Sequence, residues 1–136
     1  MPPYSRQEPA LASGGWLDRP KTAHLAYLGM NAEKLKGNLD LLLLSVLSCG
    51  PGHGYALITR LAERSGGAFD LPEGTVYPAL HRLEAAGLLH SDWEVMSGRR
   101  RRVYRLSQAG QEALADQARQ WHAFSGSVAR VIGGTA

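Results

Sequence analysis

The sequence predicts a mainly α-helical fold from which a small β-hairpin extends as a wing. Three observations lead to this prediction. Three short stretches with apolar residues at helical spacing follow one another, a pair of strand-like segments joined by a glycine-containing turn comes next, and one long helical stretch closes the chain. The predicted order is therefore helix, helix, helix, hairpin, helix, within a chain of 136 residues, which is about the size of one domain.

The first 34 residues are expected to form a flexible arm ahead of the domain. They contain prolines and glycines at short intervals and little apolar periodicity, apart from a short helical pattern over residues 22–30. The folded helix-and-hairpin domain is then assigned to residues 35–107, and the C-terminal helix to residues 108–132.

Two short helices are expected to open the domain. The first begins near Gly37, where leucine and valine recur every three or four positions, and it ends at the breakers in residues 50–52. The second runs from about residue 53 to residue 64, and a serine followed by two glycines ends it. The apolar face of the second helix is expected to contain Tyr55, Ile58, Leu61 and Ala62.

The third helix lies within residues 72–86 and ends at Gly87. Pro78 would interrupt a helix that starts at Pro72, so a start nearer Thr75, with Pro78 in the first turn, is the alternative. At 100° per residue the helix has two unlike faces. The inner face is aliphatic, with Val76, Ala79, Leu80 and Leu83, and the outer face is small or polar, with Thr75, Pro78, His81, Arg82 and Ala85, and Tyr77 on its flank.

A hairpin and a long helix complete the pattern. Strand-like residues 88–95 and 101–106 are separated by residues 96–99, in which Gly98 supplies a turn residue. Ser107 is placed to cap the last helix. The apolar positions of this helix step by three or four residues into one stripe: Leu114, Ala118, Trp121, Phe124, Val128 and Val131.

Three short helices followed by a hairpin are the plan of a winged helix-turn-helix domain. In such a domain the third helix can enter a major groove, and the wing lies along the neighbouring backbone. His81 and Arg82 on the outer face could reach base edges or phosphates. From spacing alone, an ordinary exposed arginine is the other interpretation of Arg82.

A cluster of arginines falls at the expected tip of the wing. The whole chain has a net charge of +3, whereas residues 97–105 hold five arginines and no acidic residue. Arg99, Arg100, Arg101 and Arg102 cannot all face a core, so some are expected to contact solvent or a polyanion such as DNA. Phosphate contacts of this kind supply affinity and little sequence selectivity. A solvated charged hairpin is the alternative.

Four short motifs occur in a characteristic order and spacing. They read GHGY from Gly52, GTVYPALHRLE from Gly74, GLL from Gly87 and GRRRRVYRLSQAG from Gly98. Through these motifs, residues 36–132 resemble the PadR family of transcriptional regulators. A serine and a glutamine at residues 107 and 108 depart mildly from the threonine and glutamate that are more usual there, and the long N-terminal arm is not part of the common pattern.

The resemblance implies a homodimeric repressor that binds double-stranded DNA, and many members of the family respond to a small molecule or a stress signal. It also implies that the wing arginines lie on the DNA backbone. The positions that match residues near DNA in the family are Tyr55, Thr75, Tyr77 and Arg82.

Two tyrosines admit two interpretations. Tyr55 and Tyr77 could each bury the ring near a helix N-terminus and donate the hydroxyl to a phosphate, which the resemblance favours. Each could equally cap an edge of the core with its hydroxyl in water. Tyr104 is expected to pack within the wing.

The last helix is expected to form the homodimer. A domain this small cannot bury the whole apolar stripe, and exposed apolar surfaces usually mark an interface. Pairing about a twofold axis would set two third helices about one DNA turn (~34 Å) apart, which predicts a pseudo-palindromic operator. A helix folded back on its own domain is the alternative. Trp121 could stack a planar effector molecule, or it could fill the dimer interface.

Other classes of function find less support. The chain is not expected to be an enzyme, because Cys49 sits in an apolar helix and no nucleophile motif or phosphate-binding glycine loop occurs. No cofactor is predicted, and the histidines lack metal-ligand spacing. RNA binding usually shows exposed aromatics on a sheet, which the pattern lacks. The alternative function is a winged helix that serves as an architectural or protein-interaction module without a specific operator.

A cytoplasmic location is expected, with no membrane association. No stretch reaches the ~18 uninterrupted apolar residues of a membrane span. The N-terminus lacks the continuous apolar run of a secretory signal, and a single cysteine allows no internal disulfide.

Overall fold

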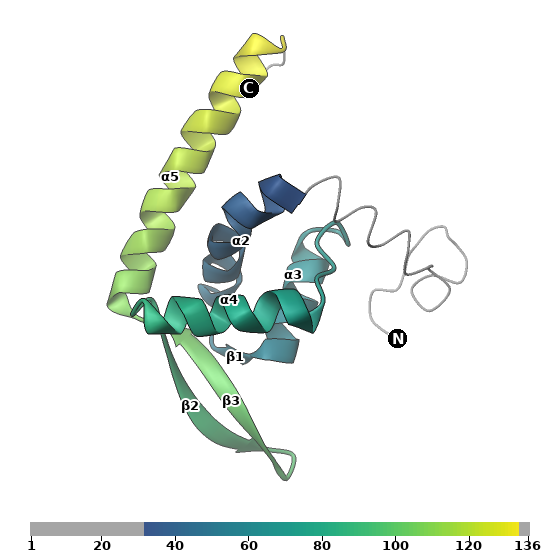
Figure 1. Cartoon of the computed structure of the whole chain (residues 1–136), viewed down its shortest axis with the longest axis vertical. Helices are drawn as coiled ribbons and strands as arrows, with labels where there is room; N and C mark the ends of the chain where they lie inside the picture. The colour runs from purple at the N-terminus through teal and green to yellow at the C-terminus, as the bar shows by residue number, and fades with distance from the viewer. Residues whose placement is uncertain (1–31, 134–136) are drawn as a thin grey trace, which may run out of the picture.

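The computed structural model describes residues 32–133, with side chains from Leu35 onward. In this part of the chain, helices α2 (Ala32–Leu47), α3 (Gly54–Arg64) and α4 (Glu73–Ala85) form a helical body. Strands β2 (Leu89–Met96) and β3 (Arg99–Leu106) make a hairpin that projects from the body, and α5 (Gln108–Val131) extends away on the opposite side (Figure 1). The predicted mainly α-helical fold with a small β-wing is confirmed. The expected flexible arm, apart from its last three residues, and the helical pattern at residues 22–30 lie outside the described residues.

Helix α2 starts five residues before Gly37, where the sequence pattern placed its beginning. Residues 32–36 are good helix formers, and a glycine inside a helix costs only about 1 kcal/mol, so Gly37 does not end the helix. At the other end, Arg60 of α3 donates to the carbonyls of Val46 and Gly50, each at 2.9 Å. Cys49 lies exposed in the turn after α2, not inside the helix as predicted.

One aliphatic core joins the three helices of the body to the base of the sheet. The predicted inner face of α4 is confirmed, since all four of its aliphatic residues are buried. In α3 the prediction was partly wrong, because Leu57 is buried and Tyr55, in the first turn, is 59% exposed at the edge of the apolar stripe. The largest fully buried side chains are Tyr104, Leu43, Leu44, Leu57, Leu80, Leu83, Leu89 and Val76.

Helix α4 begins at Glu73 with Pro72 as its N-cap residue, so the alternative start near Thr75 was wrong. Pro78 therefore lies in the second turn, where it offers no N–H to the carbonyl of Gly74. Gly74 is exposed, so solvent can satisfy that carbonyl and the helix continues through the proline.

The hairpin is longer and tighter than predicted. Met96 pairs with Arg99, so the turn consists of Ser97 and Gly98 alone, and both have positive φ (53° and 76°) as a type I′ turn requires. A third strand, β1 (Gly52–His53), pairs with β3 to give the antiparallel order β1-β3-β2. Two residues are too few for any alternating pattern, so β1 was not predictable from the sequence.

Ser107 joins α4, the wing and α5. Its N–H donates to the carbonyl of Leu88 (3.1 Å), and its hydroxyl donates to the carbonyl of Gly87 (2.6 Å) and accepts from the N–H of Gly110 (3.0 Å). The predicted helix cap is thus confirmed, and the same side chain also holds the end of α4. None of the helices in the described residues is long and apolar enough to cross a membrane.

Candidate nucleic-acid interface

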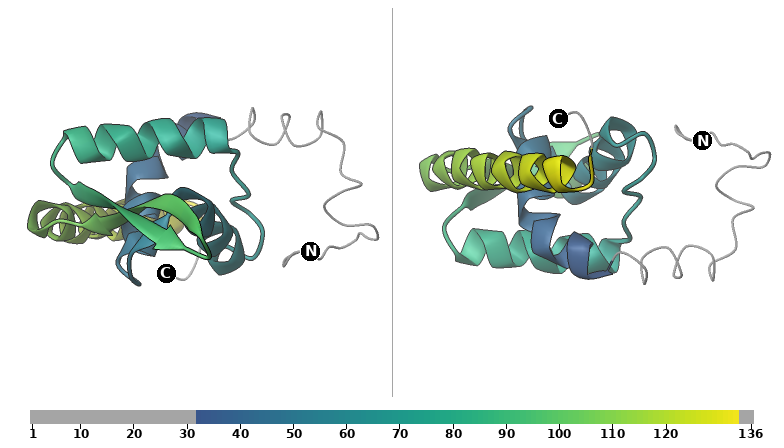
Figure 2. Two further views of the ribbon diagram at one scale, coloured as in Figure 1. Left: turned by 90° about the horizontal axis from the view of Figure 1, so that it is seen from below. Right: turned by 90° about the horizontal axis from the view of Figure 1, so that it is seen from above.

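The outer face of α4 is open along one side of the body (Figure 2). Pro78, His81 and Arg82 are exposed, and Thr75 is half-buried. These residues lie opposite the buried face of the helix, as its periodicity predicted. The exposed face offers an imidazole, a guanidinium and a hydroxyl along about two turns of helix, and these groups can bond base edges or phosphates.

Arg82 is held by an acidic residue that the sequence did not indicate. Its two terminal nitrogens meet the two carboxylate oxygens of Asp40 on α2 at 3.0 and 3.1 Å, which is a bidentate pair. This hydrogen bonding raises the pKa of Arg82 above its ordinary value. Both side chains remain partly exposed, and exposed ion pairs contribute only about 0–1 kcal/mol, so a guanine or a phosphate can compete for the guanidinium.

Tyr77 packs its ring over the start of α3. A Cβ placed on Gly54 would overlap the ring and hydroxyl of Tyr77, so the close approach of α4 to α3 depends on the absence of a side chain there. Tyr77 is half-buried against the core, whereas Tyr55 stands exposed on α3. The two tyrosines therefore flank the same helix N-terminus with different degrees of burial.

His53 caps this helix N-terminus. Its Nδ1 accepts a hydrogen bond from the N–H of Ala56 at 3.2 Å. Burial lowers the pKa of His53, and the charges of Arg101 and Arg60 lower it further. These effects favour the neutral imidazole, which is the form that can accept the capping hydrogen bond.

The strand register divides the four wing arginines between two faces of the hairpin. Arg100 and Arg102 lie opposite Val95 and Trp93, on the face that continues from the core. Arg99 and Arg101 lie on the other face, because successive side chains of a strand alternate. Within residues 32–133, only Arg102 of the four lies within ion-pair distance of a carboxylate, that of Glu84 at 3.6 Å.

The predicted dimerisation stripe on α5 divides into two parts. Leu114 packs against the core of its own domain and Ala118 is half-buried. Further along, Phe124 is 64% exposed and Val131 is 85% exposed. Trp121 and Val128 are also exposed, and so is Ile132, which follows the helix and which the periodicity did not include.

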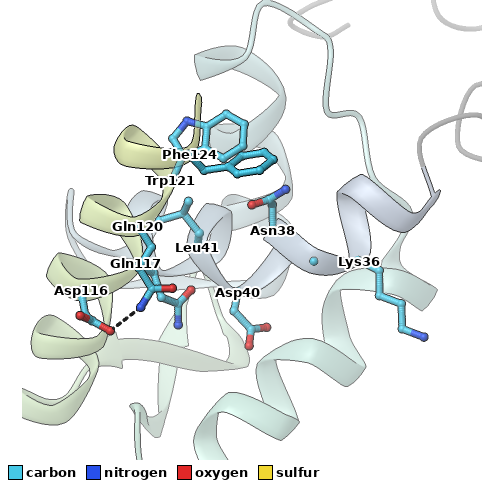
Figure 3. Close-up of a pocket in the computed structure, with 10 residues that line it drawn as sticks. Lys36, Asn38, Asp40, Leu41, Asp116, Gln117, Gln120, Trp121 and Phe124 are labelled. Atoms are coloured by element: carbon cyan, nitrogen blue, oxygen red, sulfur yellow. Dashed lines mark hydrogen bonds between the residues drawn. The ribbon is translucent and has the colours of Figure 1, made fainter. Parts of the chain in front are cut away.

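A cleft of about 560 Å³ separates α2 from α5 beside this stripe (Figure 3). Trp121 and Phe124 line it from α5, with ring centroids 6.4 Å apart, and Leu41 faces them from α2. Polar groups converge on the same space: Asn38, Asp40, Asp116, Gln117 and Gln120. Among the described residues, no three histidine, cysteine, aspartate or glutamate side chains are placed to hold a metal ion.

Comparison with known proteins identifies the family. The sequence model of the Transcriptional regulator PadR-like family matches residues 43–116, which is more than half of the chain. The chain is also similar to Transcriptional regulator Rv3488 of Mycobacterium tuberculosis, with 49% identity over 67 residues. That match covers 49% of this chain and 60% of the mycobacterial protein, so the chain spans less than two thirds of that relative.

Solved structures agree with this result. A PadR family transcriptional regulator from Eggerthella lenta has a TM-score of 0.68 and 31% identity, covering 83% of this chain and 97% of that one. A PadR-like transcriptional regulator from Bacillus cereus has a TM-score of 0.67 and 29% identity, covering 76% and 99% respectively. The resemblance that the four motifs indicated is thereby confirmed.

Gly54→Ala should destabilise the domain by about 1–3 kcal/mol, because the added Cβ overlaps Tyr77 and forces α4 away from α3. Urea unfolding followed by circular dichroism measures the change. Gly37→Ala is the matched control, since a Cβ there meets nothing within 4 Å, and it should be neutral or stabilising. Unchanged stability of Gly54→Ala would show that the contact with Tyr77 does not constrain the two helices.

Proposed function

The chain belongs to the PadR-like family of transcriptional regulators, and we propose on that premise that it is a homodimeric, sequence-specific DNA-binding repressor. Regulators of this family act by binding DNA, not by catalysis. One observation carries the proposal: a single domain combines the exposed outer face of α4 with an arginine-bearing wing, while α5, which has an exposed apolar stripe, extends away on the side opposite the wing (Figure 1). The first two features suit a duplex, and the third suits a second copy of the chain.

Helix α4 is the proposed reading helix. Its exposed Pro78, His81 and Arg82 would face base edges in a major groove. Thr75, at the start of the helix, would lie near the sugar–phosphate backbone of the DNA. Arg82 would exchange Asp40 for a guanine or a phosphate, at little cost because the ion pair is exposed. The proposed operator contact is therefore a competition between a carboxylate of the protein and an acceptor of the DNA.

Backbone contacts are assigned to the wing and to the two tyrosines. Arg100 and Arg102 of the wing would bind phosphates, releasing counterions from the duplex. Tyr77 holds its ring against the core and its hydroxyl at the start of α3, where the helix dipole favours an anion. Tyr55 is exposed in the first turn of α3, and its hydroxyl would donate a hydrogen bond to a phosphate of the same DNA strand segment.

The exposed part of the α5 stripe is the proposed dimer contact. Phe124, Val128 and Val131, together with Ile132, form an apolar surface that one domain leaves uncovered. A twofold arrangement of α5 would place two α4 helices on successive major grooves and would make the operator pseudo-palindromic. The alternative is a winged-helix architectural or interaction module, and it would show no such operator.

Binding of a small-molecule effector beside Trp121 is a second proposed function. The cleft between α2 and α5 supports it, because its volume suits a drug-sized molecule. Planar aromatic compounds should then quench Trp121 fluorescence saturably and change operator affinity. Trp121→Phe should abolish the saturable component, while the other tryptophans still respond to non-specific quenchers. Purely linear quenching in the wild type would argue against an effector at this cleft.

Selection of bound duplexes from a random pool should enrich a palindrome whose half-site centres lie about one turn apart. Titration of this duplex by fluorescence anisotropy then separates the residue roles. Arg82→Ala should relax base preference, costing about 1–3 kcal/mol at one position of each half-site. Arg100→Ala should weaken all sequences alike and reduce the salt slope by about 0.9. Absence of any enriched sequence would leave the architectural alternative.

Phe124→Asp should convert the homodimer to a monomer, because a carboxylate would be buried without a partner in the apolar interface. Sedimentation velocity reports the assembly state. Because a monomer gains nothing from a second half-site, the same variant should bind a single half-site as tightly as it binds the full palindrome. Ala123→Asp, a neighbouring exposed position off the stripe, is the matched control and should remain dimeric. A dimeric Phe124→Asp protein would refute this interface.

A further inference from the structure

We propose that Trp93 positions Arg100 and Arg102 for phosphate binding, and that the face of the wing formed by Trp93, Val95, Arg100 and Arg102 is the one that contacts DNA. We call this surface the Trp93 face. The inference rests on the proposed DNA-binding function, and it adds a contact face and a residue that no sequence motif singled out.

The geometry of the Trp93 face is a tryptophan between two guanidinium groups. Trp93 pairs directly with Arg102 across the ladder, and Arg100 occupies the diagonal position two residues away. The guanidinium carbon of Arg100 lies 4.7 Å from the centroid of the Trp93 ring, and that of Arg102 lies 5.3 Å from it. Both distances are within the ~6 Å range of a cation–π contact. The ring remains 55% exposed, so the core does not require this aromatic side chain.

Stacking on an indole orients a guanidinium without occupying its donors. The cation contacts the ring through its flat face, and its N–H groups point outward in the plane. A stacked arginine can therefore still donate to a phosphate, and it enters the complex with fewer side-chain conformations to lose. Trp93 holds two such cations side by side on one surface, at a spacing set by the strand register.

Acidic residues make the opposite face a poor surface for a phosphate backbone. Asp92 and Glu94 lie on that face with Arg99, Arg101 and Arg105. Arg105 pairs with Glu94 at 3.1 Å and with Asp92 at 3.8 Å, so the two carboxylates neutralise one cation there and would repel phosphates. The alternation of the strand has thus placed the acids and the tryptophan on different sides of the hairpin.

Among the described residues, the Trp93 face has one acidic neighbour within ion-pair distance, at its base. Glu84 of α4 accepts a hydrogen bond from Ser91 and lies 3.6 Å from Arg102. Arg100, nearer the tip, has no carboxylate within ion-pair distance in the described part of the chain. Because Glu84 belongs to α4, the contact of Glu84 with Arg102 places the base of the Trp93 face beside the proposed reading helix. The hairpin extends from the end of α4 to the tip of the wing (Figure 1). One duplex can therefore contact both the reading helix and the Trp93 face.

The test measures the affinity of the full chain for a fluorescein-labelled 30-bp duplex of random sequence, at several salt concentrations. Trp93→Leu should weaken binding by about fivefold to thirtyfold, because two guanidinium groups would then have to be ordered on binding. Trp93→Phe should recover part of the loss, because a phenyl ring can still stack a guanidinium. In a chain that already carries Arg100→Ala and Arg102→Ala, Trp93→Leu should have almost no further effect. Arg100→Ala should reduce the salt slope by about 0.9, whereas its matched control Arg99→Ala, with the same change in charge, should leave it nearly unchanged.

The outcomes separate this inference from the proposed function. If the wild-type chain binds no duplex even at low salt, the proposed DNA-binding function fails and the inference fails with it. If the wild type binds but Trp93→Leu loses as much affinity without the two arginines as with them, the tryptophan does not act through them. An effect of Arg99→Ala that exceeds that of Arg100→Ala would assign the DNA contact to the opposite face.

Discussion

The joint around Ser107 is the constraint on which the arrangement of this protein depends. Three hydrogen bonds from one residue bring together the end of α4, the beginning of β2 and the first turn of α5. Gly110 lies so close to the carbonyl of Leu88 that a Cβ there could not be accommodated. Helix α4, the wing and α5 therefore emerge from a single buried point.

Charge in this protein is organised by secondary structure more than by composition. A net charge of +3 on 136 residues is modest, and several arginines are already paired with carboxylates. What distinguishes the wing is the separation of its two faces, because strand alternation places acids on one and an aromatic ring with two cations on the other. An unbroken arginine run in the sequence thus becomes two surfaces of different chemistry. The proposed phosphate contacts therefore depend on which of the two surfaces faces the duplex.

Much of the fold could be predicted from periodicity, and the errors have local physical causes. The inner face of α4 was predicted residue by residue, because aliphatic side chains must leave water and only one helical face allows this for all four. The alternative start of α4 near Thr75 was wrong, since Gly74 is exposed and the helix tolerates Pro78 in its second turn. The turn was placed as four residues, because Met96 and Arg99 carry no signal that they pair. Strand β1 exists only through its pairing with β3.

The order of the elements, the inner face of α4, the cap at Ser107 and the presence of a basic wing could all be derived from the sequence alone, and so could the inner face of α3 except at Tyr55 and Leu57. Each of these follows from residues within a few positions of one another. The folded chain sets which distant residues come into contact: Asp40 with Arg82, Gly54 with Tyr77, and Trp93 with Arg100 and Arg102. The spacing of residues along the chain does not predict these contacts. They meet because the core and the sheet register bring distant segments together, and contact energies depend on separation in space and not on separation along the chain.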